Sequence, residues 1–222
     1  MPASTITERL QEVRQRIASA CLRSGRSPDE VTLIAVTKGF TVDAIREAYD
    51  AGIRHFGENR VQEASEKAPM LADLRDVTWH MIGHLQTNKV KTAIGLFDII
   101  HSVDSLHLAE EISRRAPHTV PAFLEANVSG ESSKFGMSLR EIGERYESIA
   151  ALSHIEVRGL MTVAPLTADR DQTRAVFREL RATAEIMGLR ELSMGMTGDF
   201  DTAIEEGATH IRVGRAIFGE RS

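Results

Sequence analysis

The stretch VTLIAVTKGF, residues 31–40, joins a short apolar run to Lys38 and then to a glycine. Continuous branched apolar residues are typical of a strand that is buried on both faces, as in parallel sheets. Lys38 comes where such a strand leaves the core, although lysine is the most strongly hydrated cationic side chain, so its amine either extends to water or takes part in chemistry. The other four lysines are predicted in polar, helix-like or loop-like surroundings: Lys67, Lys89, Lys91 and Lys134.

Seven further apolar runs follow this first one, and helix-like segments separate them. The runs are IRHFGEN, VTWHMIG, FDIIHSV, TVPAFLEANVS, HIEVRGLM, ELSM and HIRVG. Helical spacing predicts helices at residues 42–51, 60–74, 106–116, 139–151 and 171–187. Eight strand–helix units predict an α/β fold, a (β/α)8 barrel of the TIM type, with a doubly wound eight-stranded sheet as the competing architecture.

An additional helix is predicted before the first strand, at residues 4–23. Its apolar residues recur at spacings of four and three: Ile6, Leu10, Val13, Ile17 and Cys21. We expect Cys21, the single cysteine, to be a small buried apolar residue of this helix. Nothing in the chain is low in complexity or linker-like, so residues 1–222 are expected to form one domain.

The composition excludes several classes of partner. A net charge of −5 argues against a nucleic-acid-binding face. No apolar stretch approaches the roughly 20 residues that a membrane span needs, and the N-terminus lacks the pattern of a signal peptide. A lone cysteine cannot form an internal disulfide, so a reducing, cytoplasmic location is expected.

Active sites of such barrels form at the C-terminal ends of the strands. The residues predicted there are Lys38, Glu58, Asn59, His80, Gly83, His101, Ser102, Asn127, Met161, Ser193, Thr197, Arg212 and Gly214. Two of them have a structural alternative, since Asn59 could cap the helix that NRVQ begins and Asn127 could simply end its strand.

Other catalytic and metal-binding motifs are missing. His80 and His84 are four residues apart, but with no carboxylate or cysteine at ligand spacing we expect no metal site. There is no GxSxG motif of a hydrolase, and the single thiol is in the wrong place for a nucleophile. GRAIFGE lacks the Lys-Ser/Thr pair of a nucleotide-binding loop.

The last two strands lead into glycine-bearing turns, SMGMTGDF and RVGRAIFGE, each followed by a short helix. In this fold the corresponding loops frequently bind phosphate through backbone N–H groups, and Thr197 offers a hydroxyl beside them. The alternative is that the glycines only permit tight turns. A partly desolvated Lys38 could form a Schiff base with an aldehyde. Pyridoxal phosphate carries both groups, which would explain Lys38 and the final loops together.

Seven motifs along nearly the whole chain carry a family resemblance: AVTKGF, HFGENRVQE, WHMIGHLQTNK, NVSGESSKFGM, GLMTVAP, LSMGMTGDF and HIRVGRAIFG. Each is weak alone, but together they are highly specific. The sequence resembles the pyridoxal-phosphate homeostasis protein family. The resemblance implies a barrel similar to the N-terminal domain of bacterial alanine racemase, with pyridoxal 5′-phosphate attached to Lys38.

The resemblance also implies the other contacts of the cofactor. Asn59 is expected near the pyridoxal ring and Arg212 at the pyridine nitrogen. Around the phosphate it implies Met196, Thr197, Gly214 and Arg215. Thr197 stands where serine is usual in the family, and because threonine keeps the hydroxyl, we expect the contact to survive.

The expected function is storage and delivery of the cofactor without a reaction of the protein's own. The alternative is a small amino-acid racemase, and a third class is an aldolase that uses the lysine. A racemase needs an acid/base on each face of the substrate carbon, and similar racemases take a tyrosine from a second domain. Here the chain stops at the barrel, and Tyr49 and Tyr146 are predicted inside helices. A cation such as Arg212 at the pyridine nitrogen also weakens the electron sink.

The expected partners are pyridoxal phosphate and the apo-forms of enzymes that use it. The sequence does not name these enzymes. The resemblance favours a monomer, and whether Lys134 offers a second point of attachment stays open.

Overall fold

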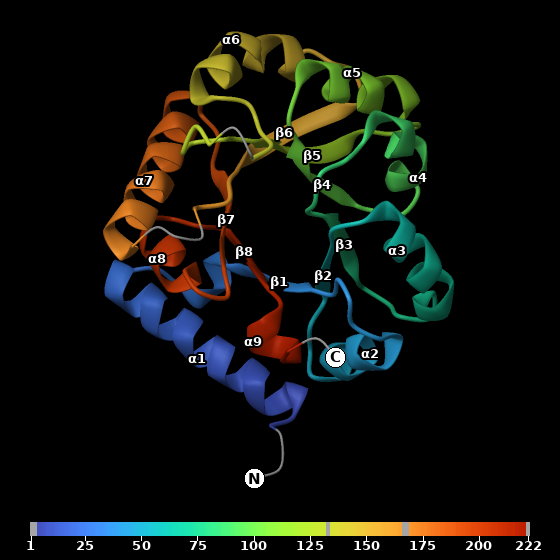
Figure 1. Cartoon of the computed structure of the whole chain (residues 1–222), viewed down its shortest axis with the longest axis vertical. Helices are drawn as coiled ribbons and strands as arrows, with labels where there is room; N and C mark the ends of the chain where they lie inside the picture. The colour runs from blue at the N-terminus through green and yellow to red at the C-terminus, as the bar shows by residue number, and fades with distance from the viewer. Residues whose placement is uncertain (1–3, 132–133, 166–168, 221–222) are drawn as a thin grey trace.

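All eight predicted apolar runs are strands, and in the computed structural model they form one closed parallel barrel in the order β1 to β8 (Figure 1). The structure describes residues 4–131, 134–165 and 169–220. The closed barrel confirms the predicted fold class and excludes the open doubly wound sheet. The strands are β1 (Thr32–Val36), β2 (His55–Glu58), β3 (Thr78–Met81), β4 (Ile99–Val103), β5 (Val120–Glu125), β6 (Ile155–Met161), β7 (Glu191–Met196) and β8 (His210–Val213).

A ring of helices surrounds the barrel (Figure 1). Most begin at a side-chain cap, and α6 begins with a capping box that Ser138 forms with Glu141. The helices are α1 (Ile6–Ser24), α2 (Val42–Asp50), α3 (Val61–Lys67), α4 (Val90–Ile94), α5 (Leu106–Arg115), α6 (Leu139–Ala150), α7 (Arg170–Ile186), α8 (Phe200–Glu205) and α9 (Arg215–Phe218). Short 3₁₀ turns η1 (Pro28–Glu30), η2 (Ala68–Leu71) and η3 (Thr87–Lys89) complete the described elements. Within the described residues no helix is both long and apolar enough to cross a membrane.

The helix predicted over residues 60–74 is wrong in its extent. Regular helix ends at Lys67, and η2 follows it. Pro69 causes the break, because proline has no N–H group to donate and its ring crowds the preceding turn. This early end places Lys67 in the last turn of α3.

The additional N-terminal helix is confirmed as α1, with Cys21 buried as predicted. Figure 1 shows α1 beside α8 and α9, the last helices of the chain. Arg9 Nε donates to the carbonyl of Ile217 at 2.7 Å, and Arg23 pairs with Glu205 at 2.7 Å. The first helix therefore ties down the elements that follow β7 and β8.

Closure of the barrel brings the two ends of the sequence together. β1 lies parallel to β8, with Ile34 opposite Arg212 and Ala35 opposite Val213. β2 flanks β1 on the other side, and β7 flanks β8. The C-terminal ends of β7, β8, β1 and β2 are thus neighbours, although residues 59–190 separate the two pairs in the sequence.

Candidate cofactor site

A cavity of about 1740 Å³ opens where β7, β8, β1 and β2 end. All seven residues predicted to contact the cofactor line it: Lys38, Asn59, Met196, Thr197, Arg212, Gly214 and Arg215. The barrel closure described above explains why these residues from distant parts of the sequence meet. Their roles toward a ligand stay predictions.

Lys38 occupies the corner of a tight turn directly after β1. The N–H of Phe40 donates to the carbonyl of Thr37 at 3.1 Å, and Gly39 has a φ of +75°. This is the pattern of a type II β-turn, which requires a left-handed residue at its third position. The turn places the half-buried Lys38 at the wall of the cavity.

Lys67 lies in a helix with polar partners, as predicted, but its burial was not expected. It is buried at the end of α3, and its ammonium contacts the segment that carries Lys38, donating to the carbonyl of Thr37 at 2.8 Å. No pattern in the sequence distinguished this lysine from those on the surface.

Asn59 does not cap a helix. The N-cap of α3 is Arg60, which makes no side-chain cap, so the capping prediction is wrong. Among the described residues, Asn59 Oδ1 is buried with no hydrogen-bond partner. A side chain at Gly83 would collide with the backbone of Asn59, so the close approach of these two segments requires glycine. The unpaired oxygen suits a ligand that donates a hydrogen bond.

Arg212 is almost fully buried and points from β8 to the base of the cavity. Its guanidinium donates to Ser193 Oγ at 2.7 Å and to the carbonyl of Thr162 at 2.8 Å. Burial lowers the pKa of Arg212 to about 10, with the carboxylates of Asp199 and Glu125 opposing that change. The group therefore remains a cation at neutral pH, and its fixed position leaves further N–H groups for a ligand.

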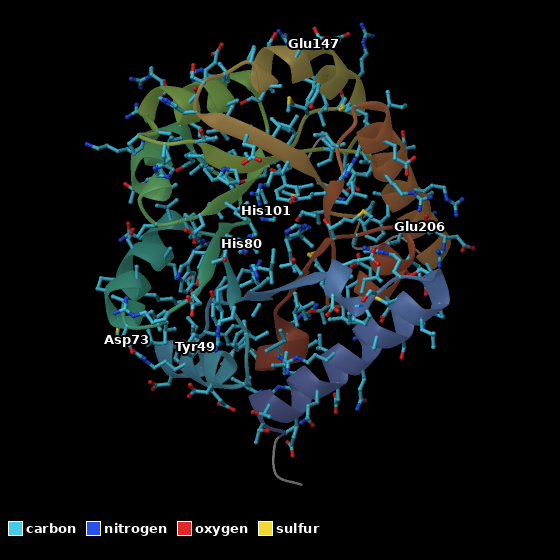
Figure 2. The ribbon with its side chains drawn as sticks, turned by 180° about the vertical axis from the view of Figure 1, so that it is seen from behind. Tyr49, Asp73, His80, His101, Glu147 and Glu206 are labelled. Atoms are coloured by element: carbon cyan, nitrogen blue, oxygen red, sulfur yellow. The ribbon has the colours of Figure 1, made fainter. Side chains whose placement is uncertain are left out.

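A chain of three histidines fixes the other side of Ser193. Hydrogen bonds run from Ser193 Oγ to His101 Nδ1 (2.8 Å), from His101 Nε2 to His80 Nδ1 (2.9 Å) and from His80 Nε2 to His55 Nδ1 (3.0 Å). Figure 2 shows His80 and His101 inside the barrel. Burial lowers the pKa of His80 and of His101 well below the usual value, so both rings are neutral. Each neutral ring carries one N–H group, which it donates along the chain.

The two histidines that were predicted at the strand ends therefore support the site from below and do not line it. His84 contacts Asp104 at 3.0 Å and stacks on the ring of Phe135 at 3.9 Å. Across the described parts of the chain, no group of three or more metal-ligating side chains occurs.

The turn after β7 is held by Asp199, a residue that the sequence reasoning missed. Asp199 Oδ1 accepts the N–H of Met196 at 2.6 Å. Burial raises the pKa of Asp199, while the Met196 N–H and Arg212 oppose the change. Thr197 and Gly198 are left at the cavity wall. An aspartate just before an apolar helix is a signal of helix starts that could have found it.

Gly214 and Arg215 form the wall contributed by the segment after β8. Gly214 is the N-cap residue of α9, and the first N–H groups of a helix have no acceptor within it. Gly214 also packs closely against Val36 of β1, where an added Cβ would lie 3.4 Å from two Val36 atoms. These distances are ordinary van der Waals contacts, so they show that the final loop lies beside the strand that leads to Lys38.

The loop after β5 contacts the cavity lining through Lys134. Residues 132 and 133 of the motif NVSGESSKFGM lie outside the described residues. Asn127 does more than end its strand, since its Nδ2 donates to the carbonyl of Glu131 at 2.8 Å. Lys134 pairs with Glu131 at 3.0 Å and donates to the carbonyl of Val163, a cavity residue, at 3.3 Å.

Known proteins resemble this chain in sequence and in fold. The sequence model described as "Alanine racemase, N-terminal domain" matches residues 9–222. The pyridoxal phosphate homeostasis protein of Aquifex aeolicus is 42% identical over 96% of this chain and 97% of its own length. That of Escherichia coli K12 is 37% identical, over 97% of both chains.

This chain belongs to the pyridoxal phosphate homeostasis protein family. Among solved structures, PipY of Synechococcus elongatus with PLP (pyridoxal phosphate) bound is 43% identical, with a TM-score of 0.83 over 93% of this chain and all of that one. An alanine racemase of Clostridium difficile has a TM-score of 0.73 over 96% of this chain and 57% of its own, at 14% identity. That second likeness shows the fold alone. We therefore interpret the cavity as a site for pyridoxal phosphate.

Proposed function

We propose that this protein binds pyridoxal 5′-phosphate as a Schiff base on Lys38 and stores and delivers it, as part of vitamin B6 homeostasis. The single observation that carries the proposal is that Lys38 and the two final glycine turns line one cavity. This ligand carries an aldehyde, which reacts with amines, and a phosphate, which accepts hydrogen bonds. The cavity offers an amine for the first and backbone N–H groups for the second.

Each of the seven predicted contact residues has a role in the proposal. The amine of Lys38 condenses with the aldehyde, so that a C=N bond forms and one water is released. Thr197, Gly214 and Arg215, with Met196 beside them, hold the phosphate. Arg212 faces the pyridine nitrogen as a fixed cation, which disfavours protonation of that nitrogen.

The side chain of Asn59 indicates that the cavity suits this ligand. Its buried and unpaired Oδ1 lacks a donor, and an orphaned acceptor costs about 1–3 kcal/mol. A ring hydroxyl of the ligand would donate to it. Asn59 would thereby orient the ring between Lys38 and Arg212.

We favour a carrier over a racemase because neither tyrosine of the chain lies at the cavity. Tyr49 lies in α2, donates its hydroxyl to the carbonyl of Arg75 at 3.3 Å, and sits at the periphery in Figure 2. Tyr146 lies in α6 and packs on the core. Neither lines the cavity. We further propose that the chain is a single domain and a monomer in the cytoplasm, and that apo-enzymes receive the cofactor.

The experiment that tests this function maps the point of attachment. Borohydride reduction of the protein incubated with pyridoxal phosphate should fix the pyridoxyl group on Lys38, as read by peptide mapping. Lys38→Ala should lose that adduct and keep measurable affinity through the phosphate contacts. Lys89→Ala, at an exposed position of η3, is the matched control and should label as the wild type does. A main adduct on Lys89 or Lys134 would refute the assignment of Lys38.

A further inference from the structure

Lys67 is the one lysine among those described whose side chain is buried, with 11% of it exposed. Its ammonium makes three contacts: to the carbonyl of Thr37 (2.8 Å), to Glu58 Oε1 (2.6 Å) and to Glu63 Oε1 (2.7 Å). An ammonium has three donors, so all of them are used within the protein. Nothing in the proposed function requires a second buried lysine at this place.

The three contacts converge on the turn that presents Lys38. The carbonyl of Thr37 closes that turn by accepting the N–H of Phe40, and the same carbonyl accepts from Lys67. On the other flank, the N–H of Gly39 donates to Glu63 Oε1 at 2.6 Å, and that oxygen also accepts from Lys67. The residues before and after Lys38 are thus both fixed to one ammonium–carboxylate group.

Glu58 anchors this group in the barrel. It is the last residue of β2 and fully buried, and its Oε1 accepts the hydroxyl of Thr37 at 2.7 Å as well as Lys67. Burial raises the pKa of Glu58, against the contacts of Lys67 and Thr37. Lys67 is therefore held between a rigid strand and a helix, and it transmits their position to the turn.

We infer that Lys67, together with Glu58 and Glu63, is a positioning residue that holds the turn of Lys38 so that its amine reaches a bound aldehyde. This inference rests on the proposed function of Lys38. Misplacing a reacting group by about 1 Å can cost on the order of a hundredfold in rate. Loss of the Lys67 contacts should therefore slow covalent attachment while the phosphate loops, which lie after β7 and β8, keep their affinity.

The test uses two ligands that share the ring and the phosphate. Pyridoxal phosphate has the aldehyde, and pyridoxine phosphate lacks it and cannot form the C=N bond. In Lys67→Met, the near-visible absorbance of the Schiff base should appear at least about tenfold more slowly than in the wild type. The dissociation constant of pyridoxine phosphate, measured by calorimetry, should stay within about threefold of the wild-type value.

Two further variants keep this test decisive. Removing Lys67 alone leaves the buried Glu58 without its cation, which is destabilising, whereas removing both charges is often neutral. The double variant Glu58→Gln/Lys67→Met should therefore fold and show the same slow attachment. Lys91→Met, an exposed lysine of α4, is the matched control and should behave as the wild type.

Amide hydrogen exchange separates this inference from the proposed function. Without Lys67, a peptide covering residues 37–40 should exchange faster than in the wild type, while a β6 peptide should not change. Unchanged exchange in the turn, or equal weakening of both ligands, would overturn the positioning role. A wild-type protein that forms no adduct on Lys38 would instead refute the proposed function, and the exchange result would still report on the turn.

Discussion

Lys38 differs from the other described lysines in what surrounds its backbone. A type II turn gives it a defined corner, and hydrogen bonds fix Thr37 and Gly39 on either side of it. Arg212 has a comparable arrangement, since Ser193 and Thr162 hold its guanidinium from within the barrel. The backbone of Lys38 and the guanidinium of Arg212 are thus both held in place at one cavity, which favours binding of a ligand without rearrangement.

Glu125 provides a prediction at the scale of one residue. It ends β5, and its Oε2 is buried without a partner among the described residues. Burial, with a smaller contribution from Asp104, raises the pKa of Glu125 from 4.5 to about 7, against Arg212. The folded state then keeps a proton that the unfolded chain loses, so the contribution of Glu125 to stability is fully present below about pH 4.5 and is lost as the pH passes 7.

Glu125→Gln removes this titration. Its free energy of unfolding relative to the wild type should therefore increase between pH 4.5 and pH 8, by roughly 2–3 kcal/mol. Urea denaturation at several pH values measures it, with Glu147→Gln at an exposed position of α6 as the control. A difference that is flat with pH would mean that Glu125 is ionised in the folded protein at little cost.

At the scale of elements, the strands could be predicted because each is a short apolar run that parallel pairing buries on both faces. The ends of helices were less accessible. The periodic pattern of residues 60–74 continues past Pro69, and only the backbone chemistry of proline ends the helix at Lys67. The order of the strands around the barrel, and hence the closure of β1 against β8, follows from alternating strands and helices.

The residues at the cavity wall were also predictable, because they follow strands at fixed positions. Their supports were not. Lys67 and the histidine chain contact the site through hydrogen bonds between elements that are distant in sequence. A lysine of a short helix and a histidine of a strand carry no sequence mark of burial. Only the packing of the whole barrel distinguishes them from surface residues.

The turn after β1 and helix α6 allow a paired prediction with glycine substitutions. Gly39 has a left-handed φ of +75°, where alanine is strained, so Gly39→Ala should destabilise the protein by about 1–2 kcal/mol. Gly143 lies inside α6 with open space around it, so Gly143→Ala should stabilise by about 0.5–1 kcal/mol. Thermal and urea unfolding compare the two. Equal signs would contradict the turn geometry assigned to Gly39.

At the scale of the whole molecule, one barrel has to serve either as a carrier or as an enzyme. The supports described above all act on residues that we propose to hold the ligand: they fix the turn of Lys38, the guanidinium of Arg212 and the turn after Met196. Catalysis of racemisation would in addition need a proton donor or acceptor on the face opposite Lys38. The tyrosines of α2 and α6 lie outside the barrel wall and do not provide it.

The protein loaded with pyridoxal phosphate should therefore exchange the α-proton of L-alanine only slowly. Incubation in deuterated water, followed by mass spectrometry and chiral chromatography, measures both exchange and inversion. We expect incorporation within about tenfold of that produced by free pyridoxal phosphate, because general acid–base catalysis typically contributes 10²–10⁴-fold and a partner for Lys38 is not provided by the tyrosines. Lys38→Ala is the control that separates exchange due to this lysine from exchange by the cofactor in solution. Rapid deuteration with racemisation, lost in Lys38→Ala, would show that the cavity contains an acid/base group opposite Lys38 and that the barrel is an enzyme.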